Sequence, residues 1–247
     1  MRLEVVPVEG LPEIEEGDEL GALIAARVRL ADGDVVVISQ KVISKAEGRL
    51  RRLDEVEPGG SARELAANLD KDPALVQLVL DESRSVIRAE RGVLIVETKS
   101  GWICANAGVD ASNVPGEGVV ALLPEDPDAS ARRIRAEILN ASGIAPGVIV
   151  SDSFGRPWRL GQTDVALGCA GLAPLDDWRG RPDREGRELA ATVIAVADEL
   201  AAAADLVRDK DSATPVALLR GIAHLVARED GPGAAALRRP EDEDLFR

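Results

Sequence analysis

Residues 150–171 read VSDSFGRPWRLGQTDVALGCAG, a segment dense in glycine, arginine, carboxylate and aromatic residues. The apolar start of this segment leads directly to the carboxylate of Asp152 and the hydroxyl of Ser153, which we predict to lie at a turn. A core strand needs no such polar groups, and a solvated loop rarely carries Phe154 and Trp158 beside them. The segment therefore predicts a buried strand that ends at a functional site.

Strands and helices surround this segment without a regular βαβα alternation. Runs rich in β-branched residues predict strands at 3–8, 34–39, 86–88, 93–97, 102–105, 119–123, 148–150 and 216–219. Apolar residues at helical spacing predict helices at about 18–29, 41–46, 62–69, 73–82, 128–141 and 188–207. We therefore predict an α+β fold with mixed or antiparallel sheets and flanking helices. The charged segment 179–186 predicts a hinge or a surface loop.

The composition limits the classes of protein to which this chain can belong. Its 247 residues are 45% hydrophobic, which is typical of a packed globular protein. The formal net charge of −14 argues against a general nucleic-acid or anionic-membrane surface, because phosphate backbones need clustered cations. An acidic protein binds a nucleotide when divalent metals bridge its carboxylates to the phosphates. We expect neither a secretory signal nor a membrane span, because the start of the chain has no long hydrophobic region and acidic residues interrupt its longest apolar stretch.

Cysteine and histidine are too scarce to carry the chemistry. Cys104 and Cys169 are the only cysteines, and their separation suits neither a zinc motif nor a disulfide framework, so a reducing cytoplasm is the expected location. His224 is the only histidine, which excludes a multi-histidine metal site. Carboxylates, hydroxyls, lysine and arginine must therefore supply the functional groups.

Two short segments, which we call corners because a turn is predicted at each, combine a carboxylate with a hydroxyl. Asp110 precedes Ser112 and Asn113, and Asp152 precedes Ser153. Such oxygen donors suit Mg²⁺ or Mn²⁺, which retain waters for phosphate oxygens. The alternatives are an Asx-turn at the first corner and a helix N-cap at the second. Because both corners lie beside glycine and aromatic residues, we favour the metal interpretation.

Basic side chains add candidate anion-binding groups. Lys41 and Lys45 are four residues apart and would share one face of a helix, where they could neutralise phosphate; the alternative is a solvated lysine pair. Arg156 and Arg159 could grip a carboxylate or phosphate, and Trp158 could stack on a planar ring; the alternative is a loop pinned by an aromatic plug. The sequence has no P-loop, no G-x-G-x-x-G after a strand and no H-E-x-x-H, so those common sites lose their main support.

Four motifs closely resemble the coenzyme F420-0: L-glutamate ligase family, and the resemblance runs nearly end to end. They are VEGLPEI at 8–14, SQKVISKAEGR at 39–49, CANAGVDASN at 104–113 and SDSFGRPWRLGQTDVALG at 151–168. The resemblance implies the distinctive α+β fold of that family, an intertwined homodimer, and one catalytic domain over 1–247 with room for two lobes. The nitroreductase-like domain that follows in two-domain relatives is absent from these residues.

The same resemblance implies a reaction. The γ-phosphoryl group of GTP activates the terminal carboxylate of F420-0 as an acyl phosphate, and the amine of L-glutamate attacks it. Further rounds add glutamates through their γ-carboxylates. Phosphoryl transfer needs positioning and charge neutralisation more than a histidine base, so the reaction suits the residues present. Mg²⁺ or Mn²⁺ is implied, and a K⁺ requirement stays open.

The resemblance also implies roles for individual residues. The metal ligands are Asp110, Asp152 and Ser153. The nucleotide site is lined by Leu11, Pro12, Glu13, Ile14, Gln40, Lys41, Lys45 and Asn113. The catalytic residues are Asp110, Asp152 and Lys45. Arg156, Trp158 and Arg159 are our candidates for binding F420-0.

The family's late loop, which also touches nucleotide and metal, corresponds to residues 207–214. Here Asp209 stands where we expect glycine, and Lys210 stands where some members place a metal-ligating side chain. This departure leaves any additional metal site in question.

Two other functions stay open at this point. One is the same ligase chemistry on a different carboxylate acceptor. The other is a non-catalytic nucleotide- or cofactor-binding protein, against which the intact Asp110, Asp152 and Lys45 argue.

Overall fold

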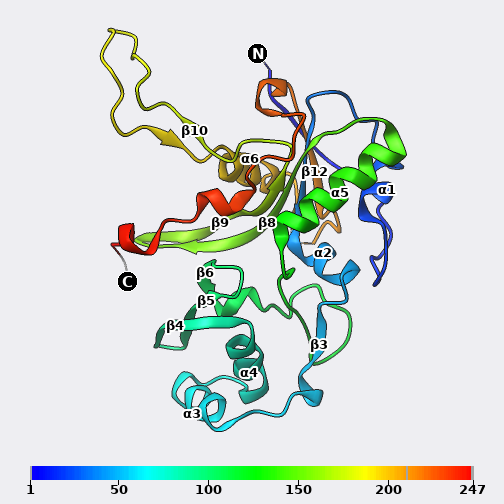
Figure 1. The fold of residues 1–247 in the computed structure, drawn as a ribbon. Coiled ribbons are helices and arrows are strands. Elements are labelled where there is room, and N and C mark those ends of the chain that lie inside the picture. Colours follow the sequence, from blue (N-terminus) through cyan, green and yellow to red (C-terminus); the bar gives the residue numbers. More distant parts are fainter. Residues whose placement is uncertain (1, 210, 246–247) are drawn as a thin grey trace.

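A five-stranded mixed sheet organises most of the chain (Figure 1). The computed structural model describes residues 2–209 and 211–245. The strand order is β1-β12-β2-β8-β9, in which only β2 and β8 run parallel to each other. The strands are β1 (Glu4–Pro7), β2 (Val35–Ser39), β8 (Gly147–Arg156), β9 (Arg159–Ala170) and β12 (Val216–Arg220). The predicted α+β class with mixed sheets and flanking helices is confirmed.

Helices cover both faces of this sheet. Val36 and Ile38 of β2 face the cluster that includes α1 (Leu20–Ala25) and α5 (Pro127–Ser142). Val35 and Val37 of the same strand face the cluster formed with α6 (Val196–Asp205). Alternate side chains of a strand point to opposite faces, so this uninterrupted apolar run is buried on both sides. We call the sheet with α1, α5 and α6 the sheet body.

A second, smaller core lies below the sheet body in Figure 1. We call it the small body. It comprises α3 (Gly60–Leu69), α4 (Pro73–Asp81), β4 (Ser83–Glu90), β5 (Val93–Thr98) and β6 (Ile103–Ala105). Asp72 caps α4, as the sequence indicates, because its carboxylate accepts from the backbone N–H groups of Ala74 and Leu75. Apart from two short strands of an arm described below, the remaining helices and strands of the described residues are α2 (Gln40–Ala46), β3 (Leu50–Arg52), β7 (Val119–Ala121), η1 (Leu53–Glu55), η2 (Asn106–Gly108), η3 (Ala223–Leu225), η4 (Ala234–Leu237) and η5 (Glu241–Glu243).

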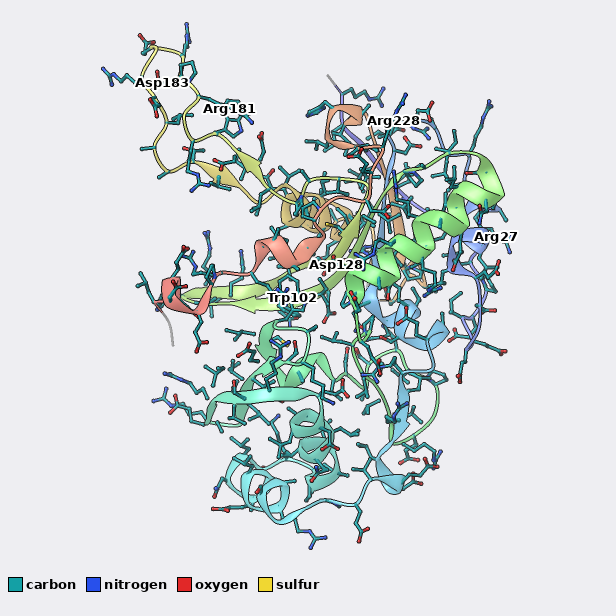
Figure 2. All side chains as sticks on the ribbon, viewed as in Figure 1. Arg27, Trp102, Asp128, Arg181, Asp183 and Arg228 are labelled. Atoms are coloured by element: carbon teal, nitrogen blue, oxygen red, sulfur yellow. The ribbon has the colours of Figure 1, made fainter. Side chains whose placement is uncertain are left out.

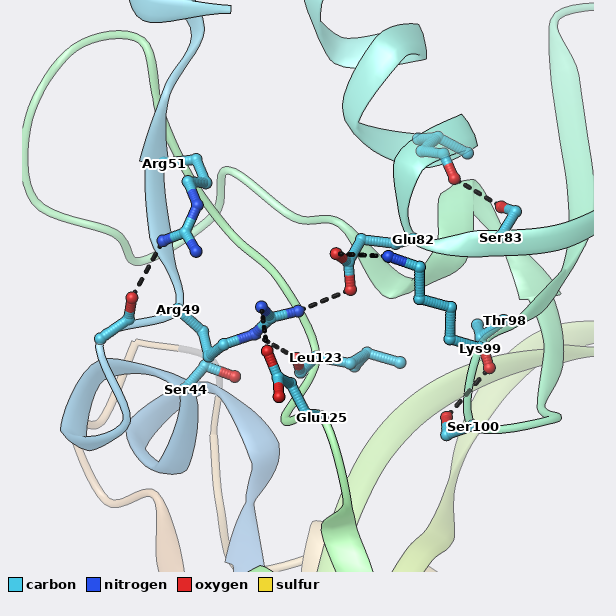
Figure 3. Close-up of polar contacts among 12 residues, drawn as sticks. Ser44, Arg49, Arg51, Glu82, Ser83, Thr98, Lys99, Ser100, Leu123 and Glu125 are labelled. Carbon is cyan, nitrogen blue, oxygen red and sulfur yellow. Dashed lines mark hydrogen bonds and ion pairs between the residues drawn. The ribbon is translucent and has the colours of Figure 1, made fainter.

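The buried guanidinium of Arg49 connects the two bodies (Figure 3). It donates to Glu82 at the end of α4 at 2.5 Å and to Glu125, just before α5, at 3.1 Å. Its Nε donates to the backbone carbonyl of Leu123 at 3.0 Å. Arg49 lies three residues after the end of α2, so these contacts tie the small body to the helix that carries Lys41 and Lys45.

The prediction of one long helix over 188–207 is wrong at its N-terminal half. The helix begins at Val196, and the preceding residues belong to an arm with the short strands β10 (Asp176–Asp177) and β11 (Val193–Ile194). The arm projects from the sheet body and includes the segment 179–186, which is an exposed loop (Figures 1 and 2). A helix in a protein is stabilised chiefly by the face it buries. Residues 196–205 have the sheet to pack on, whereas residues 188–195 are mostly exposed.

The prediction that Asp152 and Ser153 lie at a turn is also wrong. Both residues lie inside β8, where Asp152 pairs with Val165 and Ser153 pairs with Asp164. The partner strand β9 was not predicted, because its polar residues conceal its β-pattern. The chain reverses only after Arg156, so the hairpin extends well beyond the buried part of the sheet.

Within residues 2–209 and 211–245, none of the helices combines the length and the hydropathy that a transmembrane span needs.

Candidate active-site cleft

A cleft with a volume of about 970 Å³ forms where segments far apart in the sequence meet. This volume is at the upper end of the range typical of small-molecule sites. Among the predicted site residues, those that line the cleft are Leu11, Pro12, Glu13, Ile14, Lys41, Lys45, Asp110, Asn113, Asp152 and Ser153. The fold thus brings residues from the N-terminal loop, α2, the loop after η2 and β8 to one cavity.

Two lysines of α2 face this cleft. The helix begins immediately after β2, so its first turns start at the end of a sheet strand. The buried Lys45 donates to Glu13 at 2.5 Å. Lys41 donates to Asp110 at 2.7 Å and to the hydroxyl of Ser112 at 2.8 Å. The two lysines are therefore not a solvated pair, because their side chains are only 15% and 9% exposed and each ammonium group contacts a carboxylate.

Asp110 forms the Asx-turn that was the alternative to the metal interpretation, and it also contacts a cationic side chain. Its Oδ1 accepts from the backbone N–H of Ser112 at 2.8 Å, which is the Asx-turn bond, and its Oδ2 accepts from Lys41. Partial burial by itself would raise the pKa of Asp110, but hydrogen bonds from Lys41 and Ser112 outweigh it and hold that pKa below its ordinary value. Asp110 is thus an anion at neutral pH, stabilised by a positive charge.

Asp152 has the opposite electrostatic environment. Burial raises the pKa of Asp152 to about 7, a hydrogen bond from the Ser153 backbone acts against this, and the negative charge of Asp164 adds to it. Lys41 and Asp110 make smaller opposing contributions. The positive charge of Lys41 is therefore too small to offset the burial of this carboxylate, and a cation in the cleft would supply more.

The donor set fits a divalent cation of the Mg²⁺ or Mn²⁺ type. Asp110, Asp152 and Ser153 offer hard oxygen ligands on one cavity. Among the described residues, no group of three histidine, cysteine, aspartate or glutamate side chains converges on one point. A cation would therefore rest on few protein ligands and complete its shell with water and substrate phosphates, as Mg²⁺ commonly does.

Four of the predicted site residues lie outside the cleft wall. Gln40 is fully buried beneath it, where its Oε1 accepts from Ser44 at 2.9 Å. Arg156, Trp158 and Arg159 lie at the tip of the β8–β9 hairpin. Trp158 is 83% exposed, so the alternative in which this side chain anchors the loop by packing into the protein is wrong.

Sequence reasoning assigned no role to three further side chains on the cleft wall. Asp164 of β9 and Arg208 after α6 form a buried ion pair at 2.5 Å. Cys104 also lines the cleft, and burial together with the charge of Asp152 raises its thiol pKa to about 12. Asp164 and Arg208 each lie next to an apolar run in the sequence, which is the signal that could have indicated them. Their pairing could not be predicted, because 43 residues separate them.

The late loop contributes Asp209 to the cleft. The expectation for Lys210 lies outside the described residues.

Comparisons with known proteins agree on one family. The sequence model of a family described as F420-0:Gamma-glutamyl ligase matches residues 10–221. A protein of Archaeoglobus fulgidus named coenzyme F420:L-glutamate ligase is 47% identical over 100% of this chain and 97% of its own length. Proteins of the same name from Haloarcula marismortui and Methanopyrus kandleri are 46% and 44% identical, over 99% and 100% of this chain and 96% and 98% of their own lengths.

Proposed function

This chain belongs to the F420-0:gamma-glutamyl ligase family, and from that premise we propose that it joins L-glutamate to coenzyme F420-0 at the expense of GTP. The terminal carboxylate of F420-0 takes the γ-phosphoryl group of GTP, which leaves GDP and an acyl phosphate. The amine of L-glutamate then displaces phosphate and forms an amide. Later rounds extend the product through γ-carboxylates. The observation that carries this proposal is the single cleft that contains two lysines and the Asp110–Asp152 pair.

The roles follow from the charges on the cleft wall. Lys45 is buried at a strand-to-helix turn, where an ammonium group placed against phosphate interacts strongly. Glu13 would release Lys45 to the phosphates when nucleotide binds, because the present contact joins a buried cation to a largely exposed carboxylate. Asp110, Asp152 and Ser153 would hold Mg²⁺ or Mn²⁺, which neutralises phosphate charge when bound.

We also propose that residues 1–247 act as one catalytic domain in a cytoplasmic homodimer. Two free, buried thiols suit a reducing compartment. The arm and the hairpin tip expose apolar side chains that a second copy of the chain could cover, including Leu160, which is 99% exposed. The net charge of −14 gives no reason to expect nucleic acid as a partner.

The reaction is tested by product mass. The purified protein is incubated with F420-0, L-glutamate, GTP and Mn²⁺, and we expect products heavier by successive glutamate residues. Omitting GTP or the metal should abolish them. If GTP binds in a metal-dependent way but no glutamate is added, the acceptor is another carboxylate, which is the second candidate function.

Replacing Lys45 with alanine is expected to weaken GTP binding by roughly 10- to 100-fold. A hydrogen bond to a charged group contributes about 1.5–3 kcal/mol, and every 1.4 kcal/mol is about a tenfold change in affinity. Isothermal titration of GTP into the protein measures the loss. Lys99→Ala is the matched control, because Lys99 is exposed on the small body and lies outside the cleft. Equal GTP affinity in the Lys45 variant and the parent would remove Lys45 from the nucleotide site.

A further inference from the structure

We propose that Asp164, held by Arg208, is a positioning residue. It orients the Ser153 hydroxyl so that the lone pairs of the oxygen, rather than the hydrogen, are presented to a ligand in the cleft. The inference rests on the proposed function, because the partner expected for that oxygen is a cation, such as a metal ion bound to phosphate. It concerns Asp164, which lies in the motif 151–168, and Arg208, which lies in the late loop 207–214; the sequence analysis gave neither side chain a role of its own.

The pair belongs to a buried hydrogen-bond network. Arg208 donates to Asp164 Oδ2 at 2.5 Å and to the Ser151 hydroxyl oxygen at 3.1 Å. Ser151 donates its own hydroxyl to the same Oδ2 at 2.9 Å. The other carboxylate oxygen, Oδ1, accepts from Ser153 at 2.6 Å. Asp164 is 4% exposed and Arg208 is 6% exposed, so each charge depends on the other for compensation.

The last of these contacts sets the chemistry of Ser153. A hydroxyl group has one hydrogen to donate and two lone pairs to accept with. Because the hydrogen of Ser153 is committed to Asp164, any further partner of this hydroxyl meets its lone pairs. Ser153 lines the cleft beside Asp152, so its oxygen is prepared to ligate a cation.

The same contacts argue against Asp164 as a ligand itself. Its Oδ2 accepts two hydrogen bonds and its Oδ1 accepts one, all from side chains of the protein. Ligation by Asp164 would break a contact to Arg208 or to a serine in a site that water hardly reaches, which is costly. A residue that orients a ligand is instead expected to influence affinity through that ligand.

The test is a double-mutant cycle on Mn²⁺ affinity, measured by the electron paramagnetic resonance signal of free Mn²⁺ with no nucleotide present. Ser153→Ala is expected to weaken Mn²⁺ binding by about 10- to 100-fold, and Asp164→Asn by a similar factor, because the asparagine amide would donate to the Ser153 oxygen. The double variant is expected to lose no more than Ser153→Ala alone. Ser153→Thr, which keeps the hydroxyl, should bind Mn²⁺ within about threefold of the parent.

Ser151→Ala is the matched control. Ser151 is fully buried, contacts the same carboxylate and lies outside the cleft wall, so its removal should change Mn²⁺ affinity by less than about threefold. If Asp164→Asn alone does not fold, Asp164→Asn/Arg208→Gln removes both buried charges together and replaces it in the cycle.

Three results would overturn the inference. Multiplicative losses in the double variant would mean that Asp164 contacts the cation independently of Ser153. An equal loss in Ser151→Ala would make the effect one of general packing. Unchanged affinity in Asp164→Asn would leave Asp164 without influence on the cleft. If the unaltered protein binds no Mn²⁺, the metal part of the proposed function fails as well, and this outcome is separate from the other three.

Discussion

Replacing Asp152 with asparagine is expected to reduce glutamate addition by about 100- to 1,000-fold or more while the protein stays folded. Asparagine has the shape of aspartate but cannot carry the negative charge that a divalent cation needs, and removing one group that stabilises the transition-state charge commonly has an effect of this size. Product formation under saturating GTP, F420-0 and L-glutamate gives the measurement. Asp32→Asn is the control, because Asp32 is exposed and lies outside the cleft. Near-normal turnover in the Asp152 variant would contradict the assignment of this residue to the reaction.

The same substitution has a pH signature in the metal-free protein. The pKa of Asp152 is about 7 in the folded chain, and it is about 3.9 in an unfolded one. Between these values the folded state binds more protons than the unfolded state, so the carboxylate makes the free energy of unfolding fall as pH rises from about 4 to 7. Asparagine lacks this dependence.

The melting temperature of Asp152→Asn, relative to that of the parent without divalent cations, should therefore rise from pH 4 to pH 7 and then level off. A difference that is independent of pH would show that this carboxylate titrates normally in the folded protein. This outcome would not affect the expectation for turnover.

Replacing Gly168 with alanine is expected to destabilise the fold by roughly 1–3 kcal/mol or more. Gly168 is buried in β9, and a Cβ atom there would lie 2.2 Å from the backbone carbonyl of Pro127 and 2.7 Å from the backbone nitrogen of Asp128. These atoms form the first turn of α5, so no flexible side chain can move aside. The helix start is also tethered, because the Asp128 carboxylate accepts from the backbone N–H groups of Cys169 at 2.8 Å and Ala234 at 2.7 Å.

Thermal unfolding measures this effect, and a decrease in the melting temperature on the order of 5–10 °C is expected for a chain of this size. Gly60→Ala is the control, because Gly60 is in the first turn of α3 and an added Cβ atom would meet nothing within 4 Å. That variant should unfold at or slightly above the temperature of the parent. A Gly168 variant as stable as the Gly60 variant would mean that α5 can shift from β9 without cost.

The structure of this protein depends both on local sequence and on contacts between distant residues. Local sequence was sufficient to predict the elements that are stabilised by residues near one another in the chain. The buried run of β2 was predicted from its apolar residues, and the start of α4 from Asp72 and the proline that follows. The residues of the cleft were indicated by carboxylate, hydroxyl and lysine side chains beside strand ends, and by a resemblance that spans the chain.

Contacts between distant residues were not accessible in the same way. The full length of β8 and β9 became evident only when their polar residues were paired across the hairpin. The N-terminal limit of α6 depends on where the sheet beneath it ends. The three predicted residues of the hairpin tip lie away from the cleft because the hairpin extends beyond the sheet.

By itself, the sequence determined the fold class, the family and the chemical types of side chain available for the reaction. Helix caps, apolar runs and motifs act over a few residues, so they can be interpreted without knowledge of the rest of the chain. Only the tertiary structure decided that Lys41 meets Asp110 and that Arg208 neutralises Asp164. Whether a buried charge is tolerated depends on a partner that the fold delivers from elsewhere in the chain, because burial without a partner is too costly.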